Sequence, residues 1–118
     1  MNTPKLQLPG NELSLFTDLY ELTMSQAFLR QGMTATATFS LFTRTYPPNR
    51  GYFVSAGLED VLNFLSNLSF SDQAIDYLRI TGIFSDDFLQ YLIGVRFTGS
   101  VRAIPEGRPG RRDRADVA

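Results

Sequence analysis

The hydrophobic residues between positions 18 and 32 recur with the spacing of an amphipathic helix. Asp18 precedes them and can cap the helix, with Glu21 three residues later as in a capping box. Gly32 suits the left-handed conformation in which helices often end. One helical row contains Leu19, Leu22, Gln26 and Leu29, and a second group widens the apolar face: Tyr20, Met24, Ala27 and Phe28. We therefore predict a first helix that begins near Thr17 or Asp18.

The pattern then changes to a period of two residues, which is typical of half-buried strands. Residues 34–43 alternate between apolar and hydroxyl-bearing side chains, and residues 97–104 alternate in the same way. A shorter strand is expected over residues 52–56. Between the first two strands, residues 46–51 contain two prolines, an Asn and a Gly. This segment is predicted to be a turn, because proline cannot extend a strand ladder and Asn and Gly tolerate positive φ.

Three more helices are predicted between residues 57 and 94. The first of them follows Gly57 and keeps its leucines and valine at helical spacing. Ser71 caps the next, which Gly82 closes, and Ser85 caps the last, which ends at Gly94. The element order is helix, strand, strand, three helices, strand. This order predicts an α+β fold with a small, mainly antiparallel sheet covered by helices.

The domain organisation follows from the same pattern. Residues 1–13 are expected to be a flexible N-terminal segment, and residues 14–107 a single α+β domain. Residues 108–118 hold four Arg against two Asp and no apolar side chain larger than Val117. Such a segment buries too little surface to offset its ordering entropy, so it is expected to be a disordered, Arg-rich tail. The alternative for this tail is an arm that binds nucleic acid or phosphate.

Composition narrows the chemistry. The chain has no Cys and no His, which excludes a disulfide scaffold, a thiol nucleophile and a Ser-His-Asp triad. A net charge of −1 argues against a surface for nucleic acid or for an anionic membrane. No apolar run approaches the length of a membrane span, and the first ten residues lack a signal-peptide pattern. We therefore expect a cytoplasmic protein without a metal site.

Three features could carry chemistry. The acidic pairs at 59–60 and 86–87 could be catalytic carboxylates, but each is expected in a first helical turn, where negative charge is favourable and solvated. Asp18 and Tyr20 lie too close in sequence to share one buried stripe, so they are either a cap and a core aromatic or the lining of a ligand pocket. Arg50 is either a solvated turn residue or a stiffly held anion contact.

Several blocks of the chain resemble the nicotinate phosphoribosyltransferases. The first is the run Phe16-Thr17-Asp18-Leu19-Tyr20-Glu21-Leu22-Thr23-Met24 that continues to Phe28. The others are Ala37 to Phe42, Pro47-Pro48-Asn49-Arg50-Gly51-Tyr52, Ala56 to Asp60, Phe84 to Leu89 and the pair Phe97-Thr98-Gly99 and Pro105-Glu106-Gly107. The resemblance covers about residues 14–107.

This resemblance implies an enzyme of NAD biosynthesis, a glycosyltransferase of ligase type. It would join nicotinate to 5-phosphoribosyl-1-pyrophosphate and couple that step to ATP and Mg²⁺. It further implies substrate-binding roles for Tyr20, which would stack on the pyridine ring, for Asp18 beside it and for Arg50 on phosphate. The family is built from an N-terminal α+β domain and a barrel, and it forms homodimers.

The sequence departs from the family in two respects. The family's phosphorylated histidine lies on the barrel, whereas this chain has no His and is expected to be inactive alone. After Gly107 the residues resemble nothing in the family, so we expect a truncated or frameshifted gene product. The alternative function is a non-catalytic α+β module that binds another protein through its sheet edge or a helical face.

Overall fold

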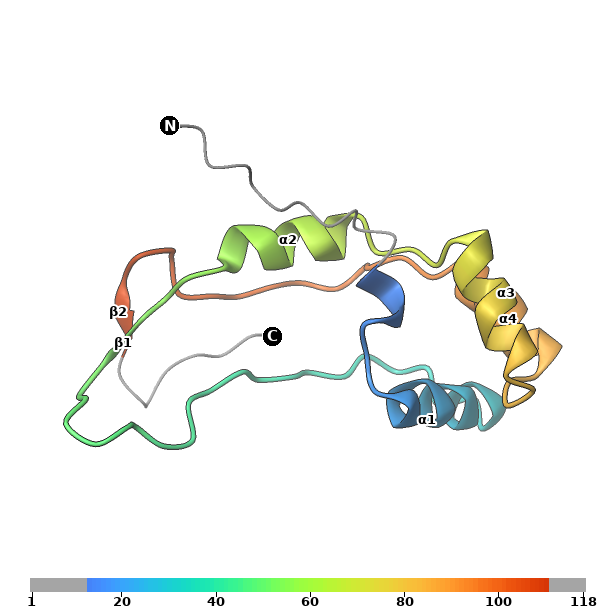
Figure 1. The fold of residues 1–118 in the computed structure, drawn as a ribbon, viewed down its shortest axis with the longest axis horizontal. Coiled ribbons are helices and arrows are strands. Elements are labelled where there is room, and N and C mark those ends of the chain that lie inside the picture. The colour runs from blue at the N-terminus through green and yellow to red at the C-terminus, as the bar shows by residue number, and fades with distance from the viewer. Residues whose placement is uncertain (1–12, 111–118) are drawn as a thin grey trace. The chain divides into compact units, whose positions relative to one another are not determined.

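The computed structural model describes residues 13–110, which form two compact units (Figure 1). The first, here called the helical unit, comprises residues 13–34 and 64–97. The second, here called the strand unit, comprises residues 35–63 and 98–110. In chain order the elements are a 3-10 helix η1 (Leu13–Leu15), α1 (Leu19–Arg30), β1 (Phe53–Val54), α2 (Leu58–Ser66), α3 (Asp72–Ile80), α4 (Asp86–Ile93) and β2 (Pro109–Gly110). The α+β class predicted from the sequence is confirmed.

The helical unit has a hydrophobic core between α3 and α4. Phe88 and Leu89 of α4 are each only 1% exposed and are the largest fully buried side chains. The Phe84 and Phe88 rings pack with centroids 5.6 Å apart. The other buried members are Ile75, Leu78 and Leu92. Partly buried side chains pack against this cluster from η1 and α1 and from the chain just before α3 and just after α4: Leu15, Leu22, Leu29, Phe70 and Val95. This core follows the apolar periodicity that predicted the helices.

The predicted helix ends are mostly correct. The Ser71 hydroxyl accepts a hydrogen bond from the Ala74 amide at 3.2 Å, which caps α3 as expected. Gly32 and Gly82 have φ values of 66° and 69°, the left-handed conformation that follows many helix C-termini. Ser85 is the N-cap residue of α4, but its hydroxyl makes no capping bond there. It donates instead to the side chain of Gln26 on α1, at 3.1 Å.

The strand unit is held together by hydrogen bonds between two segments that are distant in sequence. β1 and β2 pair antiparallel, with Phe53 opposite Gly110. The Glu106 carboxylate accepts hydrogen bonds from the amides of Gly57 and Leu58, at 2.9 and 3.0 Å, at the start of α2. Ser55 accepts a bond from the Gly107 amide at 2.7 Å and donates its own amide to the carbonyl of Arg108 at 2.9 Å. We call this set of contacts the Glu106 latch.

Two of the three predicted strands are wrong. Residues 34–43 and 97–104 form no ladder, and Phe39 and Leu41 remain 78% and 76% exposed. The alternating pattern shows that the side chains suit a half-buried strand, but it does not show which segment would pair with that strand. No described residue pairs with either segment in a ladder. Only the expected strand over 52–56 is present, shortened to β1.

The partner of β1 was not predicted. It is β2, which lies within the segment expected to be a disordered tail from residue 108 onward. The expectations for residues 1–12 and 111–118 lie outside the described residues. Within residues 13–110 no helix is long and apolar enough to cross a membrane.

Candidate functional site

The start of α1 carries two of the three residues singled out from the sequence. The chain passes from η1 through Phe16 and Thr17 to Asp18, which has the extended φ and ψ of an N-cap residue. The Glu21 amide donates to the Asp18 carbonyl at 3.1 Å, which begins the helix. The Asp18 side chain makes no capping bond. The capping box predicted between Asp18 and Glu21 is therefore wrong, because the Glu21 carboxylate accepts a hydrogen bond from the Thr17 hydroxyl instead.

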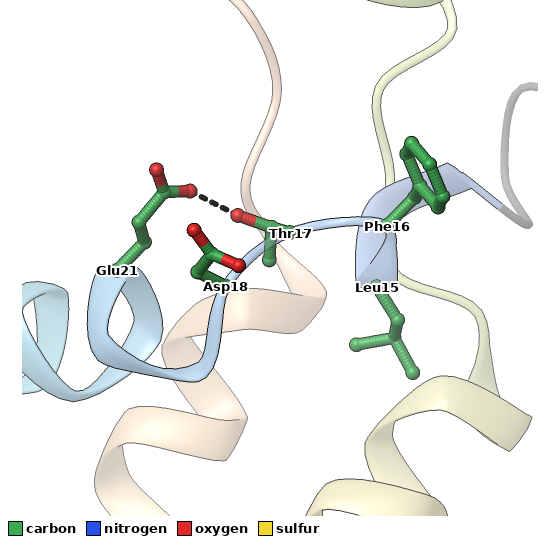
Figure 2. A pocket seen from close by; sticks show the side chains of 5 residues that line it. All are labelled: Leu15, Phe16, Thr17, Asp18 and Glu21. Carbon is green, nitrogen blue, oxygen red and sulfur yellow. Dashed lines mark hydrogen bonds between the residues drawn. The ribbon is translucent and has the colours of Figure 1, made fainter.

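This arrangement leaves the Asp18 carboxylate facing an open pocket of about 420 Å³. Figure 2 shows the Asp18 and Glu21 carboxylates on the same side of the chain as the Thr17 hydroxyl. The remaining lining comes from Leu15 and Phe16, whose side chains point in opposite directions from the chain in Figure 2. The lining contains two carboxylates and no cation. Such a lining favours groups that donate hydrogen bonds or carry positive charge.

Tyr20 lies in the first turn of α1 and does not line this pocket. Its side chain is exposed, at 58%. The alternative role of a core aromatic is therefore wrong for Tyr20, because the core of the helical unit is contacted by Leu22 and Leu29. An exposed phenol ring is available as a stacking platform for a planar ligand.

Arg50 belongs to the strand unit and lies at the end of a tight turn. Its amide donates to the Pro47 carbonyl at 3.2 Å, and Asn49 has a φ of 63°. These features describe a type II turn with proline at the second position and Asn at the third, as the turn chemistry of the sequence predicts. Tyr46 precedes this turn and Phe53 follows it. Their rings stack on each other, with centroids 5.1 Å apart and planes inclined by 18°. The Arg50 guanidinium has no partner among residues 13–110.

Two of the three candidate residues lie in the same unit, at the start of α1, and only Asp18 of these two lines the pocket. Asp18 and Tyr20 share the first turn of α1 in the helical unit, while Arg50 belongs to the strand unit. Phe16 and Thr17 line the pocket but were not singled out. The available signal was their place in the motif block that precedes the helix. Within the described part of the chain, no group of three or more acidic, His or Cys side chains could hold a metal ion.

The two acidic pairs lie in first helical turns, as the sequence predicts. Glu59 and Asp60 lie in the first turn of α2, and Asp86 and Asp87 in the first turn of α4. All four are exposed, and each pair lies at the positive end of a helix dipole. These positions agree with the expected role of the carboxylates in stabilising helix starts.

Comparison with known proteins identifies the family. The sequence model of the nicotinate phosphoribosyltransferase (NAPRTase) N-terminal domain matches residues 15–113, and so continues past residue 107, where the sequence predicted a departure. Nicotinate phosphoribosyltransferase pncB2 of Mycobacterium tuberculosis is 54% identical over 94 residues, which are 80% of this chain and 20% of that protein. The Bacillus subtilis nicotinate phosphoribosyltransferase is 41% identical over 80 residues, 67% of this chain and 16% of its own length.

A mammalian relative extends the likeness beyond bacteria. The nicotinate phosphoribosyltransferase of Mus musculus is 35% identical over 97 residues, 79% of this chain and 18% of its own. The chain spans about a fifth of the length of the curated relatives that it matches. The chain therefore belongs to the nicotinate phosphoribosyltransferase family, within which it matches the N-terminal domain.

Proposed function

We propose that this chain is the substrate-contacting N-terminal part of a nicotinate phosphoribosyltransferase. The reaction joins the ring nitrogen of nicotinate to C1 of 5-phosphoribosyl-1-pyrophosphate, while the bond from C1 to pyrophosphate breaks. The observation that carries the proposal is the exposed Tyr20 ring, which lies two residues after Asp18 in a segment matched by the family. The ring offers a stacking surface for a planar pyridine.

The acidity of the pocket agrees with the charge change in this reaction. The pyridine nitrogen becomes cationic as its bond to the ribose forms. A carboxylate held beside the ring stabilises that developing positive charge more than it stabilises the neutral ring of the bound substrate. We assign this role to Asp18. The carboxylate of nicotinate needs a cation that the pocket lining does not contain.

Arg50 is proposed as a contact to phosphate or pyrophosphate. Its guanidinium is exposed and has no partner among the described residues, and it ends a type II turn flanked by the stacked rings of Tyr46 and Phe53. A planar guanidinium recognises phosphate through paired, charge-assisted hydrogen bonds. This assignment supposes that the substrate-binding residues of the full-length protein include both units of this chain.

The full-length protein is proposed to use ATP and Mg²⁺ and to act as a homodimer in the cytoplasm. The exposed apolar side chains Tyr20, Met24 and Phe28 on one side of α1 support assembly with further protein. This chain alone is proposed to be inactive, because it has no His to accept the phosphoryl group of ATP. Purified chain supplied with nicotinate, phosphoribosyl pyrophosphate, ATP and Mg²⁺ should form no nicotinate mononucleotide. Turnover that survives Tyr20→Ala would contradict this.

The site assignment is tested by grafting residues 1–106 onto the remainder of a family enzyme. Tyr20→Ala should raise the KM for nicotinate about 5- to 30-fold, as loss of an aromatic contact does, and leave the KM for phosphoribosyl pyrophosphate nearly unchanged. Arg50→Ala should do the reverse. The matched controls are Tyr77→Ala and Arg102→Ala, which remove an exposed Tyr and an exposed Arg outside the proposed site. A lowered melting temperature with normal kinetics for Tyr20→Ala would remove the proposed site.

A further inference from the structure

Helix α1 is apolar around most of its circumference, so hydrophobicity does not specify which face it buries. Leu22 and Leu29 pack against the core of the helical unit. On another face, three large apolar side chains remain 42% to 58% exposed: Tyr20, Met24 and Phe28. A helix rotated about its axis could bury the ring and thioether side chains of that second group and would gain a similar apolar contact. Some other interaction must therefore select the observed orientation.

The interactions that select the observed orientation of α1 are the hydrogen bonds of one buried polar side chain, Gln26. Gln26 lies on the inward face between Leu22 and Leu29, and it is only 7% exposed. Its Oε1 accepts the Ser85 amide at 2.7 Å and the Ser85 hydroxyl at 3.1 Å. Its Nε2 donates to the Ile83 carbonyl at a longer 3.5 Å. Both polar ends of the Gln26 side chain thus meet the segment that joins α3 to α4.

These bonds exist in only one orientation of α1. Rotation that brought Met24 inward would withdraw Gln26 and leave the Ser85 amide and the Ile83 carbonyl without this partner. Ser85 is the N-cap residue of α4, and its own hydroxyl is committed to Gln26. Buried polar side chains at core positions are known to fix the register of packed helices at the expense of net stability.

We propose that Gln26 is a positioning residue that fixes the rotation of α1 and thereby keeps Tyr20, Met24 and Phe28 on the accessible side. Its functional consequence rests on the proposed role of Tyr20. The Tyr20 ring stays available to substrate because Gln26 holds another face of α1 against the segment that joins α3 to α4. The role of Gln26 is specificity of orientation and not a gain in stability.

The test uses the 118-residue chain, with its methionine methyl groups labelled for NMR and a soluble gadolinium chelate as the probe. Met24 reports the outer face of α1, and Met33, which is 63% exposed and beyond the helix, is the internal reference. In the wild type the chelate should relax both methyls strongly. In Gln26→Leu, the Met24 enhancement relative to Met33 should fall by about half if both orientations are equally populated, or a second Met24 resonance should appear.

Three variants complete the design. Gln90→Leu makes the same chemical change on the exposed face of α4 and should leave the Met24 ratio unchanged. Ser85→Ala keeps the amide that Gln26 binds and should retain the wild-type ratio. Gln26→Met, of similar length and without polar groups, is a second test should Gln26→Leu not fold.

The proposal is overturned if a folded Gln26→Leu or Gln26→Met keeps the wild-type Met24 ratio. It is also overturned if neither variant folds, because Gln26 would then act through stability. The readout requires no substrate, so it is independent of the kinetic test of Tyr20. If a Gln26 variant changes the Met24 ratio while Tyr20→Ala has normal kinetics, the positioning role of Gln26 is supported and the proposed function is contradicted.

Discussion

The two units of this chain are stabilised in different ways. All the buried hydrophobic residues of the described chain belong to the helical unit: Ala74, Ile75, Leu78, Phe84, Phe88, Leu89 and Leu92. The strand unit contributes none to that set and is closed by β1–β2 pairing and by the Glu106 latch. Side-chain burial therefore stabilises one unit, whereas hydrogen bonds between distant main-chain segments stabilise the other.

This difference shows that apolar content alone does not produce a core. The strand unit also contains large apolar side chains, yet Phe39, Leu41 and Phe42 are 60% to 78% exposed. In the helical unit, neighbouring helices cover one another because α3 and α4 pack in contact. An extended segment without a paired neighbour cannot cover its own side chains, because they project from both of its faces.

The largest expected effect is on the core of the helical unit. Phe88→Ala removes a ring that is 1% exposed and should lower the free energy of unfolding by about 3–5 kcal/mol. Phe39→Ala removes the same ring from an exposed position in the strand unit and should change it by less than about 0.5 kcal/mol. Urea denaturation followed by circular dichroism measures both. Equal losses for the two variants would contradict the comparison.

A smaller effect is expected when each unit loses a helix cap. Glu106→Ala removes the remote carboxylate from the start of α2, and Ser71→Ala removes the local cap of α3. Each should cost about 1 kcal/mol and speed amide exchange at the helix start. In Glu106→Ala the faster exchange should extend to Ser55 and Gly107, because the latch joins them, whereas in Ser71→Ala it should stay within one turn. Faster exchange confined to α2 would show that no latch exists.

The stacked rings of Tyr46 and Phe53 that flank the Arg50 turn should contribute about as much free energy of unfolding as a helix cap, or less. Tyr46→Ala removes a stacked ring, at a cost of about 0.5–1.5 kcal/mol, and should raise the backbone mobility of Arg50. Tyr52→Ala is the matched control, because Tyr52 is an exposed ring beside the same turn and outside the stack. The ¹⁵N heteronuclear NOE at Arg50 measures that mobility. The same loss of order in both variants would exclude a specific role for the stack.

The smallest effect is expected within the turn itself. Asn49 has a φ of 63°, which glycine adopts without strain, so Asn49→Gly should change the free energy of unfolding by only a few tenths of a kcal/mol. Asn49→Val should cost about 1 kcal/mol or more, since a β-branched side chain clashes with the backbone at positive φ. Thermal unfolding monitored by NMR at Arg50 distinguishes the two variants. A Val that is tolerated as well as Gly would mean that the type II turn is not maintained.

The sequence predicted the helical unit well because its signals are local. Ser71 caps a helix only three residues away, and Gly82 marks an end that depends on its own backbone conformation. The strand unit depends on contacts between residues about fifty positions apart, such as Glu106 with Gly57, which no periodicity reveals. Pro109 also gave no strand signal, because proline is rare in ladders.

The candidate site was predicted in the same uneven way. Helical spacing placed Asp18 and Tyr20 in one turn, and the turn residues around Arg50 predicted the conformation that carries it. The bond from Thr17 to Glu21, which leaves the Asp18 carboxylate facing the pocket, could not be foreseen, because either Thr17 or Asp18 suits the start of that helix. Choosing between two adjacent capping residues requires the three-dimensional path of the chain into α1.

The Glu106 latch has a consequence for how the chain could be cut and rejoined. Residues 58 and 106 lie next to each other, because the Leu58 amide donates a hydrogen bond to the Glu106 carboxylate. The stretch between them is therefore an excursion with neighbouring ends, the arrangement that permits insertion and circular permutation in other proteins. A short linker between Gly57 and Gly107 would bridge the excised stretch without stretching the backbone, and the excised stretch could be closed on itself by another. Because Glu106 lies within the excised stretch, such a splice would keep the β1–β2 pairing and the bonds from Ser55 to Gly107 and Arg108, and it would give up the carboxylate contacts.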